Sequence, residues 1–306
     1  MSSRLVGARY GKDNVRVYKV HRDEATGVQT VVEMTICVLL EGEIDVSYTQ
    51  ADNSVVVATD SMKNTVYIQA KLHPVTPPEL FASILGTHFV ETYSHIHSAH
   101  ISIVTHRWTR MALDNVPHPH SFLRDGTETR NVNATITKGN GIEITSAISG
   151  LTVLKSTNSQ FHSFIRDEFT TLPETWDRIL STDVDASWTW EPFANLDAVK
   201  ADIPKFDATW NAARDITMRT FAAENSPSVQ NTMYKMADQI LAAEPSVALV
   251  DYSLPNKHYF EVDLSWHKGI KNTGKDAEVY IPQSGPNGLI KCSVGRNGER
   301  RESSKL

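Results

Sequence analysis

Residues 15–43, which read VRVYKVHRDEATGVQTVVEMTICVLLEGE, decide the class of fold that this chain can form. From Val15 to Val20 apolar and polar residues alternate, as they do in a strand with one buried face. A polar turn over 23–27 then leads into a longer, mostly apolar run over 29–43. Strands joined by so short a turn pair antiparallel, because parallel strands need a long crossover connection. The stretch therefore predicts a β-hairpin as the start of an antiparallel sheet.

Helical patterns follow the hairpin. The polar residues Thr59, Asp60 and Ser61 are typical helix N-caps and precede apolar positions at helical spacing. Residues 76–79, Thr-Pro-Pro-Glu, have the form of a capping box and predict a second helix that ends near Tyr93. Strand-like segments over 100–111 and 121–125 complete the first half of the chain.

The second half of the sequence repeats this order of elements. Its predicted elements are a strand pair over 131–138 and 142–153, helices over 206–221 and from Ser226-Pro227 onward, and an alternating strand over 259–267. Each half thus follows strand, strand, helix, helix, strand, strand, although the residues themselves do not visibly repeat. This order predicts an α+β fold with antiparallel sheets and helices on one face.

We therefore expect two halves, residues 1–137 and 138–295, and a polar tail over 296–306. Each half would leave sheet edges exposed, which favours closure of a barrel with other subunits. The tail ends in Ser304-Lys305-Leu306, a tripeptide that an import receptor reads as a peroxisomal address. Localisation in the peroxisome is the resulting prediction.

Composition excludes several classes of partner. Lys plus Arg number 30 against 36 for Asp plus Glu, so the net charge of -6 argues against a nucleic acid or an anionic membrane surface. Two distant cysteines, Cys37 and Cys292, do not suggest a disulfide framework and fit a reducing compartment. The longest apolar runs, such as 36–40, are too short to span a bilayer, and the first residues lack the pattern of a secretory signal. An anionic ligand would have to be bound by a few local cations.

The segment 151–178, LTVLKSTNSQFHSFIRDEFTTLPETWDR, contains the first candidate binding residues. Phe161 offers an aromatic face for stacking, and the planar guanidinium of Arg178 can donate to two edge atoms of a ligand. A flat, anionic heteroaromatic molecule needs this combination. By residue type alone, however, a core phenylalanine and a surface arginine explain the pair as well.

Histidines suggest a different chemistry. His95, His97, His100 and His106 lie close together in the sequence, and His118 and His120 occupy a PHPH turn. A metal site needs three or four converging ligands, whereas His95 and His97 at the end of the predicted helix would point in different directions. His100 and His106 could share one face of a strand. Histidines that hydrogen-bond at buried or interfacial positions remain the favoured interpretation.

Other candidates are ambiguous by type. A lysine such as Lys12 is ordinarily a solvated charge, and a threonine such as Thr59 at a helix start is ordinarily a cap. Asn256 and His258 lie where a turn is predicted to enter the last strand. The sequence lacks a phosphate-binding P-loop, a dinucleotide-binding glycine motif and a G-x-S-x-G elbow, so it offers no obvious cofactor site.

Sequence blocks along almost the whole chain resemble those of the urate oxidase (uricase) family. They occur in one order and read ARYGKDNVRVYKV, ADNSVVVATDSMKNT, ILGTHF, HRWTRM, GLTVLKSTNSQF, RDEF, ETWDRILSTDVDA, KFDATW, SVQNTMYKMADQIL, YSLPNKHYFEVDLSWHKG and PNGLIKC. The resemblance implies a tandem T-fold subunit and a homotetramer around a tunnel. It also implies oxidation of urate by O2 to 5-hydroxyisourate and hydrogen peroxide, without a metal or an organic cofactor.

The same resemblance implies a role for each candidate residue. In the ligand-binding part, Phe161 would stack on the purine, Arg178 would hold one edge, Val229 and Gln230 would hold the opposite edge, and Asn256 would help to place oxygen or water. In the proton-transfer part, Lys12 and Thr59 would form a base relay, His258 would complete the proton path, and Asp60 would contribute beside Thr59. Lys12, Thr59 and Asp60 would come from a neighbouring subunit.

Two alternatives differ in their chemistry. A metal-dependent purine or pterin hydrolase on the related T-fold would use the histidines from His95 to His106 and would be sensitive to chelators. A non-catalytic relative that keeps only the fold would be expected to have lost Lys12, Thr59 or His258, and all three are present.

Overall fold

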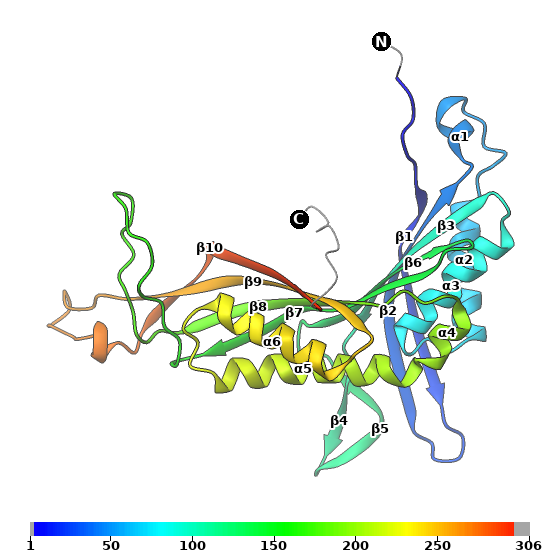
Figure 1. The fold of residues 1–306 in the computed structure, drawn as a ribbon. Coiled ribbons are helices and arrows are strands. Elements are labelled where there is room, and N and C mark those ends of the chain that lie inside the picture. Colours follow the sequence, from blue (N-terminus) through cyan, green and yellow to red (C-terminus); the bar gives the residue numbers. More distant parts are fainter. Residues whose placement is uncertain (1–2, 297–306) are drawn as a thin grey trace.

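One antiparallel sheet of eight strands is the centre of the computed structural model, which describes residues 3–296 (Figure 1). Its strands, in spatial order, are β1 (Tyr10–Arg22), β2 (Gln29–Gly42), β3 (Ile96–His106), β6 (Thr129–Thr137), β7 (Gly141–Lys155), β8 (Leu180–Trp190), β9 (Val247–Glu261) and β10 (Tyr280–Gly295). The predicted hairpin is confirmed, because β1 and β2 pair from Tyr10 with Leu40 to Arg22 with Gln29. Asp23 closes the turn, donating its N–H to the Val28 carbonyl at 3.0 Å.

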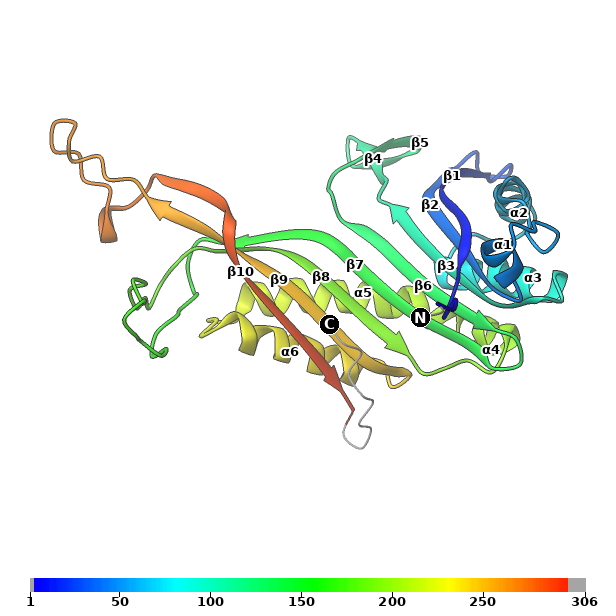
Figure 2. The ribbon, with the colours of Figure 1, turned by 90° about the horizontal axis from the view of Figure 1, so that it is seen from above.

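Helices cover the outer side of the bent sheet (Figures 1 and 2). They are α2 (Thr59–Leu72), α3 (Pro78–Thr92), α4 (Leu196–Ala201), α5 (Ile203–Ala223) and α6 (Val229–Ala243), while the short α1 (Asp45–Thr49) follows β2. This arrangement confirms the predicted α+β fold with helices on one face. No helix among residues 3–296 is long and apolar enough to cross a membrane.

The predicted strands over 100–111 and 121–125 need correction. β3 ends at His106, and its neighbour in the sheet is β6. β4 (Thr109–Leu113) and β5 (Val116–Leu123) form a separate two-stranded hairpin that projects from the body (Figure 1). Two successive residues with positive φ, Asp114 at 51° and Asn115 at 64°, form its turn, a geometry that matches the twist of paired strands.

Long-range contacts of two side chains redirect the chain after β3. Arg107 Nε donates to Asp125 Oδ1 at 2.8 Å, and Trp108 Nε1 donates to Glu33 Oε2 at 2.8 Å. Because both partners are distant in sequence, the local alternation of residues 100–111 gives no sign of the break.

The predicted helix caps are also wrong. α2 begins at Thr59 with Ala58 as N-cap, and α3 begins at Pro78 with Pro77 as N-cap, in neither case with a side-chain cap. Glu79 is fully buried instead of closing a capping box. Its carboxylate accepts hydrogen bonds from Arg130 Nη2 at 2.8 Å and Ser146 Oγ at 2.7 Å. Ser146 Oγ in turn accepts from the indole of Trp190 at 3.0 Å, so one buried network joins α3, β6, β7 and β8.

The last predicted strand is only partly correct. Strand β9 runs from Val247 to Glu261, so the prediction covers only its last three residues, and the alternating residues 262–267 lie in the loop that follows it. Asp263 accepts the N–H of Ser265 at 2.9 Å, and Asn272 donates to the carbonyls of Val262 and Val279 at 2.9 and 2.8 Å. These side-chain bonds satisfy the backbone groups that a strand ladder would otherwise use.

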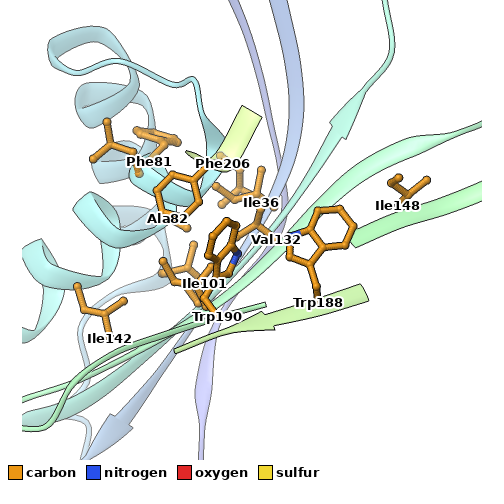
Figure 3. Close-up of a cluster of buried hydrophobic side chains, with 14 of the residues drawn as sticks. Ile36, Phe81, Ala82, Ile101, Val132, Ile142, Ile148, Trp188, Trp190 and Phe206 are labelled. Atoms are coloured by element: carbon orange, nitrogen blue, oxygen red, sulfur yellow. The ribbon is translucent and has the colours of Figure 1, made fainter. Parts of the chain in front are cut away.

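A single hydrophobic core connects both halves of the sheet (Figure 3). Trp190 on β8 meets Phe206 on α5 edge to face, with ring centroids 4.9 Å apart. Core side chains from both halves surround this pair, among them Ile36, Phe81, Ile101, Val132, Ile142, Ile148 and Trp188. The division at residue 137 stays a prediction.

Candidate active site

Phe161 and Arg178 lie together in the loop between β7 and β8. The backbone of Phe161 pairs with Thr175, donating its N–H to the Thr175 carbonyl at 2.8 Å and accepting the return bond at 3.0 Å. Arg178 Cζ lies 5.2 Å from the centroid of the Phe161 ring. The structure thus brings the aromatic face and the guanidinium into one place, as the sequence predicted.

Asp177 fixes the two ends of this loop to each other. Its carboxylate accepts a hydrogen bond from the Thr157 hydroxyl at 2.8 Å and another from the Asn158 N–H at 3.0 Å. Asn158 has a φ of 62°, a left-handed conformation that asparagine tolerates better than most residues. Arg178 follows Asp177 directly, so its position depends on the same bonds.

Ser226 joins the loop to the start of α6. Its carbonyl accepts the Gln160 N–H at 2.8 Å, and its own N–H donates to the Asn158 carbonyl at 3.0 Å. Lys155 Nζ donates to Ser226 Oγ at 2.8 Å and to the Glu224 carbonyl at 2.7 Å. Burial lowers the pKa of the Lys155 ammonium. These bonds hold the segment that carries Phe161 beside the segment that leads to Val229.

Arg178 has a donor group without a partner. Its Nε is buried and makes no hydrogen bond with any of residues 3–296, and burial lowers the pKa of the guanidinium. An unsatisfied buried N–H costs about 1–3 kcal/mol, more when it belongs to a charged group. A ligand that presents an acceptor beside Phe161 would remove this cost.

The first turn of α6 supplies further donors. Ser228 is the N-cap and accepts the Asn231 N–H at 3.2 Å, while Val229 and Gln230 are the first two helical residues. Backbone N–H groups at such an end lack intrahelical partners and attract negative charge. Val229 is buried and Gln230 is exposed. Val229 and Asn256 line the same small internal cavity, which places the start of α6 against β9.

Asn256 and His258 lie within β9, which corrects the prediction that they belong to a turn entering a strand. Asn256 pairs with Thr182 on β8, and His258 pairs with Gln283 on β10. Their spacing of two residues puts both side chains on the same face of the strand. The His258 ring lies 6.0 Å from the ring of Phe260. We call Phe161, Arg178, Val229, Gln230, Asn256 and His258 the binding cluster.

A second group of predicted residues comes from the first half of the chain. Lys12 on β1 pairs with Val38 and is followed by a β-bulge. Gly11 beside it is required, because a Cβ there would lie 1.7 Å from the Val38 carbonyl oxygen. Thr59 and Asp60 open α2, and Asp60 accepts a hydrogen bond from Lys63 Nζ at 2.6 Å.

Electrostatics connect the two members of this group that carry charge. The hydrogen bond from Lys63 and its positive charge lower the pKa of the Asp60 carboxyl, and the charge of Lys12 contributes in the same direction. Lys12 and Asp60 are therefore close enough to interact within one chain. We call Lys12, Thr59 and Asp60 the Lys12 cluster.

The two clusters lie at opposite ends of the chain's sheet. β1 and the start of α2 stand at one end, and the loop that contains Phe161 stands at the other, in both views (Figures 1 and 2). The structure thus brings together Phe161 with Arg178, Val229 with Asn256, and Lys12 with Asp60, but it does not bring the two clusters together in one chain.

Comparison with known proteins decides the family. A sequence model of the uricase family matches residues 8–135 and 144–291. The chain belongs to the uricase family. Uricase from Aspergillus flavus is 70% identical to it over 295 residues, covering 96% of this chain and 98% of the relative. Uricase from Cyberlindnera jadinii is 49% identical over 311 residues, covering 100% of both proteins.

Solved structures support the same family at the level of the fold. The crystal structure of uricase from Arthrobacter globiformis has a TM-score of 0.87 and 35% sequence identity, covering 99% of this chain and 98% of that one. The urate oxidase resemblance of the sequence and the classification as an enzyme are confirmed. The α+β architecture is consistent with the T-fold.

The histidines that the alternative, a metal-dependent purine or pterin hydrolase, would use have other partners. His95 lies in the turn after α3 and His97 on β3, which corrects their placement at the end of a helix, and His118 and His120 lie on β5. Within residues 3–296 no three His, Cys, Asp or Glu side chains converge as metal ligands. The partners are the Val55 carbonyl for His95, Glu43 for His97, Thr135 and Glu41 for His100, and Thr35 for His106.

Sequence reasoning missed the residues that position the binding cluster. They are Asp177 and Ser226, which hydrogen-bond to loop residues, and Lys155, which donates to Ser226 71 residues away. Their only local signal is the density of polar residues at the ends of the strands and helices.

Proposed function

We propose that the chain catalyses the reaction of urate with O2 and water to give 5-hydroxyisourate and hydrogen peroxide. Urate gives up two electrons, O2 accepts them as it is reduced to peroxide, and water supplies the hydroxyl group. The unpartnered donor of Arg178, held beside the ring of Phe161, is the observation that carries the proposal. Membership of the uricase family supports the choice of urate as substrate.

In this proposal the binding cluster holds the purine flat. Phe161 stacks on the ring system, and Arg178 donates to acceptors at one edge. At the opposite edge, the Val229 N–H donates to a carbonyl oxygen, and the Gln230 amide offers both a donor and an acceptor. This pattern matches the alternating C=O and N–H groups of a purine trione.

The Lys12 cluster and His258 move protons in the proposal. Lys12 and Thr59 act as the general base relay, Asp60 contributes at the same helix start, and His258 completes the proton path. Asn256 lies over the ring and places O2 or water. Deprotonated urate is electron-rich enough to react with O2, so the proposed reaction uses no metal or organic cofactor.

We propose that this site is completed by a second copy of the chain, in a homotetramer around a tunnel. The opposite locations of the two clusters support this, since one chain cannot supply both to one ligand. The outer edges of β1 and β10 also have no strand neighbour among the described residues, and such edges invite pairing.

Peroxisomal import is part of the proposal as well. It rests on Ser304-Lys305-Leu306, which lie outside the described residues, and on the terminal position that the import receptor requires. Deletion of the tripeptide should leave a fluorescently tagged chain outside peroxisomes in fractionated cells.

A direct assay tests the reaction. The purified chain is mixed with urate under air, with and without EDTA, while loss of ultraviolet absorbance and formation of peroxide are followed together. We expect equal amounts of urate lost and peroxide formed, unaffected by EDTA. No loss of urate under oxygen would refute the proposal, and loss that requires added metal would favour a hydrolase.

A further inference from the structure

The loop that carries Phe161 contains a second ring stacked on it. The Phe164 ring lies 4.9 Å from the Phe161 ring, with 12° between their planes. The guanidinium of Arg166 follows, its Cζ 5.5 Å from the centroid of Phe164. With Arg178, whose Cζ lies 5.2 Å from Phe161, the contacts run Arg178, Phe161, Phe164, Arg166. We call these four side chains the aromatic stack.

The backbone of the loop is shaped to form this stack. Ser163 has a φ of 59°, a left-handed conformation that is costly for a residue other than glycine, and its N–H donates to Glu174 Oε1 at 2.8 Å. The resulting turn folds Phe164 back onto the ring that precedes it by three residues. Arg166 Nη1 donates to the Leu172 carbonyl at 2.8 Å, which holds this exposed cation over Phe164.

General burial of apolar groups does not explain the arrangement. In the same loop Ile165 is 94% exposed and Phe169 is 82% exposed. Phe164, which precedes both of these residues in the loop, is half-buried. The loop therefore leaves apolar side chains in solvent on either side of Arg166 while it orders one ring against the residue that faces the ligand.

We propose that Phe164 is a positioning residue for the purine and that Arg166 selects for an anionic one; the inference rests on the proposed function. A ring backed by a parallel neighbour keeps one plane, so Phe161 is ready to stack before the ligand arrives. The face of a phenyl ring is electronegative and repels an anion. A cation at the far side of the ring pair offsets this repulsion. A neutral purine gains little from the same charge.

Dissociation constants measured without turnover test both parts. Urate, an anion at neutral pH, and hypoxanthine, which is uncharged there, are titrated calorimetrically under anaerobic conditions. Phe164→Leu should weaken the binding of both ligands about fivefold, because a ring pair is lost, whereas Phe164→Tyr should bind as the parent does. Phe169→Leu, a change at an exposed ring of the same loop, is the matched control and should have no effect.

Arg166→Gln should weaken urate binding about threefold more than hypoxanthine binding, and Arg166→Lys should restore the difference. High salt should reduce the effect of Arg166 and leave that of Phe164. Arg166 is exposed, so its variants should keep the parent melting temperature and remain informative even where Phe164→Leu is destabilised.

Two results would overturn the inference. Unchanged urate binding in Phe164→Leu would remove the positioning role, and equal losses for both ligands in Arg166→Gln would remove the charge selection. Failure of the proposed reaction is a separate result. An unmodified chain that binds urate but forms no peroxide would refute the reaction while the ratios of dissociation constants still decide the roles of Phe164 and Arg166.

Discussion

The binding cluster and the Lys12 cluster differ in the number of contacts within one chain that hold their residues in place. Around Phe161, hydrogen bonds accepted by Asp177 and bonds made by Ser226 fix the loop, and Lys155 in turn donates to Ser226. Around Lys12, the described contacts are a strand pairing, a bulge and a charge interaction with Asp60. If the proposed roles hold, ligand binding uses a geometry that the folding of one chain establishes, whereas proton transfer needs the approach of a second chain.

The largest expected effect comes from removing the base. Lys12→Met should reduce the turnover number by about 10²–10⁴-fold, the usual contribution of a positioned acid or base. The dissociation constant of urate should change by less than about threefold, because the binding cluster is untouched. Steady-state kinetics and anaerobic calorimetry measure the two quantities. Near-normal turnover in this variant would show that the roles assigned to Lys12 and Thr59 are wrong.

Mixed assemblies test directly whether the clusters meet between chains. Lys12→Met and Arg178→Gln chains are co-expressed with different affinity tags, purified through both, and assayed at a urate concentration well below the raised dissociation constant of Arg178→Gln, where each is poorly active alone. If every site takes Lys12 from one chain and Arg178 from the other, random pairing should restore about a quarter of the sites. If one chain supplied both residues, no mixture would recover activity. Doubly substituted chains mixed with Lys12→Met chains are the control and should stay inactive.

Removal of the edge donor should have a smaller effect, confined to affinity. Arg178→Gln should raise the dissociation constant of urate by about 10–100-fold, the usual value of hydrogen bonds from a charged donor. The melting temperature should not fall, since Nε of Arg178 has no partner among the described residues. Calorimetry and thermal denaturation check these two outcomes. A large loss of stability would indicate that Arg178 supports the loop and is not held ready for a ligand.

The smallest expected effect concerns the stability contributed by Asp183 on β8 and Lys257 on β9. Hydrogen bonds from Lys257 and Thr152 lower the pKa of the Asp183 carboxyl. A carboxyl with a lowered pKa contributes stability above its unfolded pKa of about 3.9, and this contribution is lost as the pH falls through the lower, folded pKa. Asp183→Asn should therefore lower stability at neutral pH, by about 1 kcal/mol or less because solvent screens the pair.

Thermal denaturation from neutral to acid pH measures this difference. The gap between Asp183→Asn and the parent should close as the pH falls below the unfolded pKa and through the lower, folded pKa of Asp183. It should also be independent of protein concentration, because a single chain makes the pair. A gap that widened in acid, or one that followed concentration, would contradict the assignment.

Sequence reasoning recovered the fold where local periodicity and burial coincide. The β1–β2 hairpin and the helices α5 and α6 have the apolar spacing that their buried faces require. It missed β8 and β10; β10 is a mostly exposed end strand with no buried face to impose a pattern. It placed the strand of β9 at 259–267, too far along the chain, because Val262 and Leu264 continue the alternation, although Asn272 and Asp263 hydrogen-bond to the backbone groups there.

The sequence shows the residue types of the candidate site, but it does not show where these residues lie relative to one another in the fold. Phe161 and Arg178 are separated by a loop, and their contact depends on Asp177 and on Ser226, which lies beyond two more helices. The candidate residues were assigned by resemblance to a family, because a family's motifs mark residues that come together in the fold although they are distant in sequence. The aromatic stack had no signature in the sequence, since it depends on the left-handed turn at Ser163.

The buried carboxylate of Glu79 determines the smallest piece of this chain that can be stable. It receives one hydrogen bond from Arg130, before residue 137, and one from Ser146, after it. A fragment cut between them would leave a buried charge short of a donor, which is costly in a protein interior. The two halves of the repeated pattern are therefore not expected to be stable apart. Heat should melt the chain in one cooperative calorimetric transition, and neither half should refold by itself.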